Sequence, residues 1–239
     1  MALSFAGRRF APVPHWTLLA IAGMALFAAL GRWQLDRAEE KRELFAAFAA
    51  GSDEVLELPA GLEPVGRYRR VTVGGRYDAS RQFLLDNMTH DGVPGMHVLT
   101  PLLREDGTTV IVNRGFVPSS GRRSQLPELP AGGEPRRVSG RMDFLPRPGV
   151  ELEAPPSSGW PRLLSFPRTA DLASALDTPV HPQVLLLDAD QPDGYLRDWQ
   201  PPGMTPDKHV GYAVQWFGLA AAVFVTWFVL SIRPGVEPK

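Results

Sequence analysis

Two uncharged apolar runs, one near each end of the chain, constrain its fold more than any other feature. The first covers residues 16–30 and is followed by Gly31 and Arg32; the second covers residues 210–232 and is followed by Arg233. A helix of about 20 apolar residues crosses the hydrocarbon core of a bilayer. The second run reaches that length, and the first does so if its helix extends into residues 13–14 and 33–35. The pattern predicts two transmembrane helices with a water-facing domain between them.

The first run also has features of a secretory signal peptide, because Arg8 and Arg9 precede its apolar core. A signal peptide ends in a small-x-small cleavage site. Here the small residues Ala28 and Ala29 are followed by Leu30 and Arg32. The run is therefore better explained as an uncleaved helix.

Two spans place both chain termini on the same side of the membrane, but charge does not choose the side. Basic residues flank the spans on both sides: Arg8, Arg9, Arg233 and Lys239 in the tails, and Arg32, Arg37, Lys41 and Arg42 next to the central domain. Long domains cross a membrane largely regardless of charge. The orientation therefore stays open at the level of charge counting.

Between the spans, the sequence predicts a mainly antiparallel β domain with minor helices. Short apolar runs, several of them alternating, predict strands at 69–77, 82–87, 96–103, 108–113, 136–144 and 184–187. Helices are predicted at 33–50 and 169–176. We expect a bulge or turn at Gly74-Gly75, a turn at 92–95 and a hairpin at Asp106-Gly107. Residues 121–135 and 145–161 are rich in Pro and Gly and are expected to be loops.

The predicted fold class is a membrane protein with two transmembrane α-helices flanking a mainly antiparallel β (α+β) extramembrane domain. The predicted boundaries are an N-terminal tail at 1–14, the first span at 15–35, the domain at 36–208, the second span at 209–232 and a C-terminal tail at 233–239.

Several function classes are disfavoured by composition. The chain has no cysteine, which excludes disulfides and thiolate metal sites. Its net charge is -1 and it has no basic stripe with interleaved aromatics, so we expect no nucleic-acid partner. Nucleophile-elbow, zincin, P-loop and dinucleotide-binding motifs are absent, so we expect no catalytic residues and no enzyme activity.

Four motifs occur in a fixed order relative to the two runs. They are GRWQLDR at 31–37, GVPG at 92–95 followed by VLTPL at 98–102, VNRGFVP at 112–118, and HVGYAVQWF at 209–217. Together they resemble the surfeit locus protein 1 family over nearly the whole chain. Phe116 stands where that family usually has Trp.

The resemblance implies an assembly factor for haem-copper cytochrome c oxidase that assists haem A delivery to the large catalytic subunit. It also implies haem A synthase as a further candidate partner, the bacterial inner membrane as the location, and a periplasmic central domain with both tails in the cytoplasm. The short N-terminal tail leaves no room for a mitochondrial transit peptide. The alternative is a membrane scaffold that holds oxidase subunits or haem synthase together without binding haem.

His209 is the sharpest site candidate, because a neutral imidazole at a membrane interface can ligate haem iron as an axial ligand. The resemblance implies haem A binding through this histidine in some bacterial members. Tyr212 and Trp216 follow at helical spacing on one face and could flank a porphyrin. Trp33, Arg32 and Arg37 lie at the matching end of the first span, where an Arg could pair with a propionate. The structural alternatives are a helix-anchoring histidine and arginines that reach the interface.

Residues 113–115 follow the strongest strand, and we expect them to be structural. Gly115 is expected at positive φ and Arg114 bonded to backbone carbonyls. His90, His97 and His181 lack metal-ligand spacing.

Overall fold

The computed structural model describes residues 4–5, 8–50, 54–119, 127–146 and 159–234. It divides into two compact units, which are treated separately below. One comprises Met1–Ala46 and Pro202–Lys239, and the other Ala47–Pro201.

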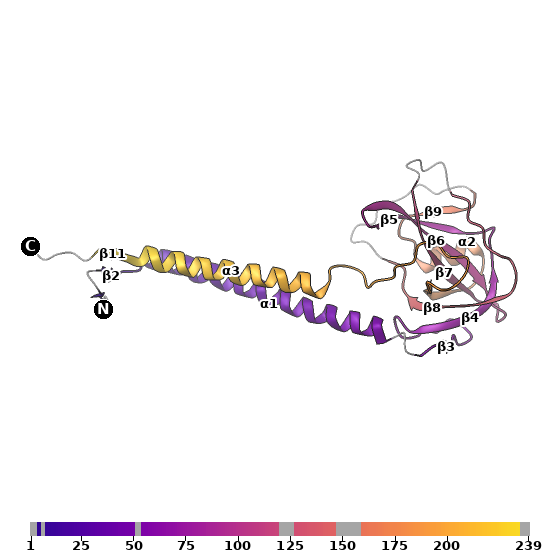
Figure 1. Cartoon of the computed structure of the whole chain (residues 1–239), viewed down its shortest axis with the longest axis horizontal. Helices are drawn as coiled ribbons and strands as arrows, with labels where there is room; N and C mark the ends of the chain where they lie inside the picture. The colour runs from indigo at the N-terminus through magenta and orange to yellow at the C-terminus, as the bar shows by residue number, and fades with distance from the viewer. Residues whose placement is uncertain (1–3, 6–7, 51–53, 120–126, 147–158, 235–239) are drawn as a thin grey trace, which may run out of the picture. The chain divides into compact units, whose positions relative to one another are not determined.

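The first unit is a hairpin of two long helices, α1 (Pro14–Ala50) and α3 (Pro206–Ser231) (Figure 1). The helices run antiparallel, since Trp227 Nε1 donates to Thr17 Oγ1 at 3.1 Å near one end and Trp216 stacks on Phe27 farther along. Both are long and apolar enough to cross a membrane, as predicted. The helical segments predicted at 15–35 and 33–50 form one continuous helix, because no helix-breaking residue separates them.

The tails pair into a small sheet that the sequence did not reveal. Strands β1 (Ser4–Phe5), β2 (Arg8–Phe10) and β11 (Ile232–Pro234) lie in the order β1-β2-β11, with antiparallel pairing throughout. Phe10 packs against Trp227 and Phe228 at the end of α3. This contact attaches the N-terminal strand to the second helix.

The second unit is the predicted β domain (Figure 1). Its strands are β3 (Leu56–Glu57), β4 (Arg70–Tyr77), β5 (Phe83–His90), β6 (Val93–Leu103), β7 (Thr109–Pro118), β8 (Arg136–Asp143), β9 (Arg162–Leu164) and β10 (Val180–Leu187), with helix α2 at Thr169–Leu176. The sheet order is β3-β4-β8-β10-β7-β6-β5-β9. Most neighbours are antiparallel, and the pairs β3–β4, β5–β9 and β7–β10 are parallel.

An additional pairing of β4 with β6 closes strands β4, β8, β10, β7 and β6 into a ring. Gly75 explains how β4 can take part in both pairings. Its backbone pairs with β8, and a Cβ on it would lie 2.6 Å from the carbonyl oxygen of Leu103 in β6. The predicted bulge or turn at Gly74-Gly75 is therefore wrong. These glycines continue the strand in register, and Gly75 permits a close backbone approach.

The two expected turns had different outcomes. The hairpin at Asp106-Gly107 is confirmed, with Gly107 at φ 79°. The turn expected at 92–95 is formed instead by Asp91 and Gly92, both at positive φ, and Gly95 lies inside β6. A Cβ on Gly95 would clash with the ring of Phe116, so this glycine makes room for a neighbouring side chain.

The domain core lies on both faces of the curved sheet. One cluster of buried side chains, including Val73, Leu102 and Val112, fills the ring. A second cluster packs the apolar side chains Leu172 and Leu176 of α2 against the outer face of the sheet. Residues 127–135 contain no helix or strand, as predicted, whereas residues 121–126 and 147–158 of the two predicted loops lie outside the described residues.

Candidate functional site

His209 lies in the first turns of α3 and is buried against α1. Its Nδ1 is 2.7 Å from Oε1 of Gln34, and the two side chains are only 7% and 8% exposed. These residues belong to the first and last of the four motifs, 175 positions apart in sequence. The hairpin therefore joins two of the motifs in one buried polar contact between α1 and α3.

Helical periodicity explains why Gln34 faces α3. Gly31, Gln34 and Ala38 are the buried residues of this part of α1, spaced three and four apart so that they share one face. A Cβ on Gly31 would lie 2.8 Å from the ring of Phe217. The glycine thus leaves room for the ring of Phe217 on α1, beside the His209–Gln34 contact.

The contact with Gln34 determines which imidazole nitrogen of His209 is available. With a carbonyl oxygen facing it, Nδ1 carries the proton and donates. In the neutral ring Nε2 then keeps its lone pair, and no described residue forms a hydrogen bond with it. Metal-binding histidines are commonly oriented in this way by an acceptor on the other nitrogen.

The three aromatic candidates differ in exposure and in their contacts. Tyr212 is 44% exposed and Trp33 is 50% exposed, while Trp216 is half-buried and stacks on Phe27 with ring centroids 5.8 Å apart. The exposed rings of Tyr212 and Trp33 are free to contact lipid or a ligand.

The two arginine candidates already have partners on α1. Arg32 pairs with Asp36 at 3.0 Å, and Arg37 pairs with Glu40 at 2.6 Å. The guanidinium of Arg37 also lies 5.8 Å from the ring centroid of Trp33. These exposed pairs are weak, so either arginine can exchange its carboxylate for another anion.

Arg114 performs the structural role expected of it. Only 1% exposed, it donates to the carbonyl oxygens of Asp193 at 2.6 Å and Pro130 at 2.7 Å. It also bonds Gln82 Oε1, and its guanidinium lies over the ring of Tyr77. Burial lowers the pKa of Arg114 and raises the pKa of Tyr77 to about 12. Gly115 has φ 114°, as predicted.

Two histidines that seemed scattered in sequence meet at one aromatic residue. The rings of His90 and His97 lie 5.6 and 6.2 Å from that of Phe116, and His97 also contacts Trp199. Asn113 Nδ2 donates to Nδ1 of His97 at 3.1 Å, and burial lowers the pKa of His97 to about 4. Sequence spacing missed this cluster because β-bulges shift the pairing in both β5 and β6.

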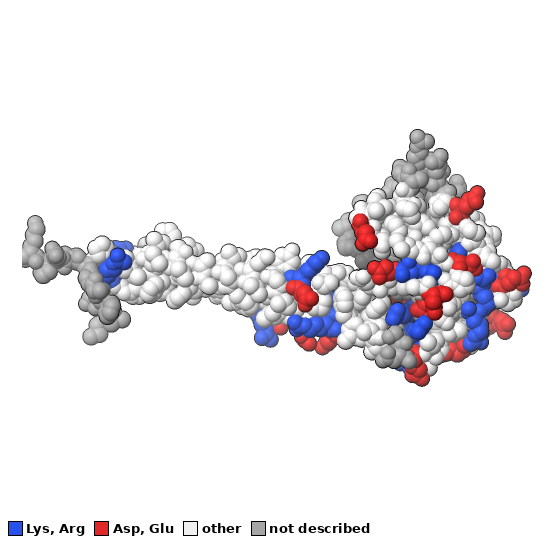
Figure 2. Space-filling view, viewed as in Figure 1, with Lys and Arg blue, Asp and Glu red and all other residues white. Residues whose placement is uncertain are grey.

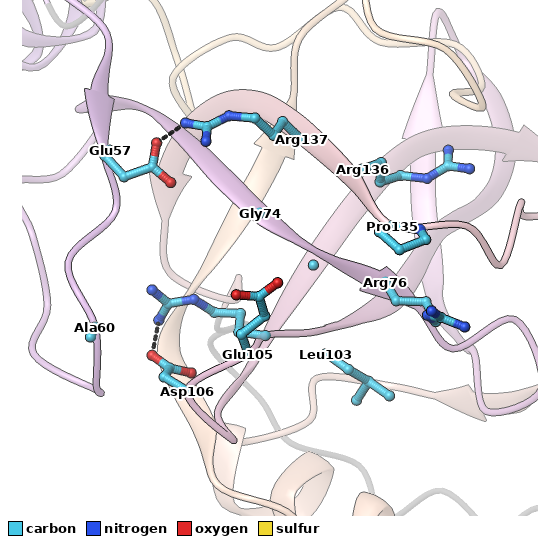
Figure 3. A pocket seen from close by; sticks show the side chains of 12 residues that line it. Glu57, Ala60, Gly74, Arg76, Leu103, Glu105, Asp106, Pro135, Arg136 and Arg137 are labelled. Atoms are coloured by element: carbon cyan, nitrogen blue, oxygen red, sulfur yellow. Dashed lines mark hydrogen bonds and ion pairs between the residues drawn. The ribbon is translucent and has the colours of Figure 1, made fainter.

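The β domain also has an open pocket of about 850 Å³ (Figure 3). Four arginines and three acidic residues line it: Arg76, Arg104, Arg136, Arg137, Glu57, Glu105 and Asp106. Arg104 pairs with Asp106 at 3.0 Å, and Figure 3 shows Arg137 bonded to Glu57. Ion pairs thus fix much of this rim. Among the residues that the structure describes, no group of three or more His, Asp or Glu side chains forms a metal-binding cluster.

Comparison with known proteins gives a consistent result. The sequence model of the SURF1 family matches residues 21–221. Surfeit locus protein 1 of Rattus norvegicus is 31% identical, with 93% of this chain and 78% of the relative aligned, and that of Homo sapiens is 30% identical, with 93% and 79% aligned. An uncharacterized SURF1-like protein of Mycobacterium bovis is 28% identical, with 91% and 84% aligned.

Proposed function

Because this chain belongs to the SURF1 family, we propose that it is an assembly factor for haem-copper cytochrome c oxidase, with haem A as its cargo and His209 as the axial ligand. In this proposal the protein catalyses no reaction. It receives haem A at the end of the helical hairpin that carries His209 and assists its insertion into the large catalytic subunit, and haem A synthase is the candidate donor.

The observation that carries this proposal is the contact between His209 and Gln34. The acceptor on Gln34 orients the imidazole, and in the neutral ring it leaves the lone pair of Nε2 available, the form in which histidine binds iron. A single neutral ligand suits cargo that must later be released. Trp33 and Tyr212 would offer exposed aromatic surface, and Arg32 and Arg37 would offer guanidinium groups for propionates.

The fit to haem concerns the ligating atom rather than a preformed cavity. His209 is 7% exposed, so a porphyrin reaches Nε2 only when this side chain turns outward or the helices separate locally. Of these two movements, only a local separation that keeps Nδ1 bonded to Gln34 retains the imidazole orientation on which the proposal rests. The proposal therefore requires an opening of the hairpin next to Gly31.

The same burial favours a second candidate function, a scaffold without haem. In that role the His209–Gln34 bond would simply fix the register of α1 and α3, and the exposed surfaces would hold oxidase subunits or haem synthase together. In the haem-binding function His209 must ligate iron after the hairpin has folded, whereas in the scaffold function it only holds α1 and α3 in register.

Complementation of oxidase assembly tests the proposal. In a bacterial strain that lacks its own copy of this protein, we expect the wild type to restore the haem A content of the purified oxidase. His209→Ala should fail to do so, although its own level in the membrane stays normal. Val214→Ala, on the same helix and 65% exposed, serves as the matched control and should behave as wild type. Full restoration by His209→Ala would support the scaffold instead.

The proposed location is the bacterial inner membrane, with the β domain in the periplasm and both tails in the cytoplasm. The two spans and the family support this arrangement. Because the chain has no cysteine, a single introduced one gives an unambiguous label. In spheroplasts, a membrane-impermeant maleimide should modify Asp190→Cys in the domain and leave Lys239→Cys unmodified. The reverse pattern would overturn the proposed orientation.

A further inference from the structure

The helical hairpin contains an apolar groove of about 740 Å³ at the end that carries the chain tails. Its walls come from α1 and α3 and consist mostly of Ala, Leu, Val and aromatic side chains, including Trp16 and Trp227. The volume is within the range of small-molecule sites, roughly 300–1,000 Å³. It is distant along the helices from His209, which lies at the opposite end.

The two ends of the hairpin differ in what covers the glycines of α1. Near His209, the ring of Phe217 packs directly on Gly31, where a Cβ would lie 2.8 Å from the ring. At Gly23, in the groove, the nearest atom to such a Cβ is Val223 Cγ1 at 3.8 Å. Gly23 lines the groove, so an additional apolar chain lying in the groove would pass along this glycine.

Two polar residues of the groove wall have their side-chain donors bonded within the hairpin. Trp227 Nε1 donates to Thr17, and Ser231 Oγ donates to the carbonyl oxygen of Trp227. Arg233 is different, because it lines the groove at its end and has no carboxylate partner among the described residues. The groove therefore combines an apolar wall with one available cation.

A second arginine lies directly across from this cation. In the pairing of β2 with β11, Arg9 is the partner of Arg233. Directly opposed side chains of antiparallel strands are close, and like charges there are destabilising. Residues 1–35 and 209–234 contain no Asp or Glu. On the face shown in Figure 2, no acidic residue that the structure describes lies beside the basic atoms at this end. Within the described part of the chain, no carboxylate neutralises the opposed pair, which makes the pair a candidate site for an external anion.

We propose that this groove binds one anionic phospholipid of the surrounding bilayer, with an acyl chain along Gly23 and the phosphate between Arg9 and Arg233. An acyl chain matches the apolar walls, and the phosphate neutralises the opposed guanidiniums. Arginine binds phosphate through a bidentate fork. Arg32, Arg37 and Arg42 at the other end of the hairpin each pair with a carboxylate that an incoming anion must displace, whereas Arg9 and Arg233 have no carboxylate partner among the described residues.

Native mass spectrometry of the full chain in detergent tests this site. The probes are phosphatidylglycerol and phosphatidylcholine with identical acyl chains. The wild type should retain one phosphatidylglycerol in preference to phosphatidylcholine. Arg233→Gln should weaken that retention about fivefold, the effect of one cation at an anionic lipid surface. Gly23→Leu should also weaken it by filling the groove, and the helix tolerates leucine well. Arg42→Gln, which removes an arginine paired with Glu39, is the control and should retain the lipid.

Three results would overturn the proposal. Equal retention of the two lipids would show that the headgroup charge is not recognised. Wild-type retention by Arg233→Gln would remove the phosphate site. If Arg233→Gln lost phosphatidylglycerol while Gly23→Leu retained it fully, the headgroup would bind the arginines without an acyl chain lying in the groove.

Discussion

Replacing Arg114 with methionine should destabilise the β domain by about 3 kcal/mol. Methionine removes the donors to the carbonyl oxygens of Asp193 and Pro130, which lie 2.6 and 2.7 Å away. Each buried acceptor left without a partner costs about 1–3 kcal/mol. Gln82 Oε1 is less affected, since Thr100 Oγ1 still donates to it at 2.7 Å. Removal of a buried charge that lacks a strong ion pair offsets part of the loss.

The assay is thermal or urea unfolding of the full chain in detergent, followed by the fluorescence of domain tryptophans such as Trp160 and Trp199. For a domain of this size, about 3 kcal/mol corresponds to a decrease in Tm of about 6–12 °C. Arg114→Lys should be destabilised by a similar amount, because one ammonium group cannot reproduce the guanidinium fork. Arg69→Met removes an exposed pair with Glu54 and serves as the control, with an expected change under about 1 kcal/mol. If Arg114→Met were as stable as this control, the structural role given to Arg114 would be wrong.

Three further predictions concern pH and close backbone or helix contacts. His97 has a folded-state pKa near 4 and an unfolded value of 6.5, so its neutral form stabilises the fold above pH 6.5 and this contribution is lost as pH falls toward 4. The free energy of unfolding of the wild type should therefore fall by up to about 3 kcal/mol more than that of His97→Gln when the pH is lowered from 6.5 to 4. Urea unfolding of both proteins at the two pH values measures this difference. Gly115→Ala should lower the free energy of unfolding by about 1–3 kcal/mol or more, because φ is 114° and the new Cβ would lie 2.6 Å from the carbonyl oxygen of Leu196. Urea unfolding measures this loss, and an unchanged midpoint would contradict the reasoning. Gly31→Leu should separate α1 from α3 and lower the midpoint of helix melting in detergent, followed by far-UV circular dichroism, whereas a midpoint at or above that of the wild type would refute the close contact with Phe217.

The two helices and most strands of the domain could be predicted because their signals are local. Uninterrupted apolar runs indicate the spans, and alternating residues indicate β4, β6, β7 and β8. The predicted helix at 169–176 coincides with α2. The motifs at 31–37 and 209–217 could also be recognised in the sequence, and the contact between Gln34 and His209 joins them in the structure.

Features that depend on contacts between distant segments could not be predicted in this way. Gly75 resembles a bulge in sequence, and only the pairing of β4 with β6 reveals its close approach to Leu103. Gln34 looks like an ordinary interfacial residue until α3 brings His209 beside it. The tail sheet has only two- and three-residue strands, too short for a periodic signal. The pairing of Arg9 with Arg233 in this sheet could therefore not be predicted from the sequence.

The visible spectrum of the purified protein tests the haem-binding proposal most directly. We would express the wild type, His209→Ala and the control Val214→Ala in a host that makes haem A and purify each in detergent. The proposal predicts a haem A Soret band in the wild type and in the control that is lost in His209→Ala. A colourless wild type, or a band of equal strength in His209→Ala, would contradict ligation by His209 and leave this residue as the helix anchor that its bond to Gln34 already makes it.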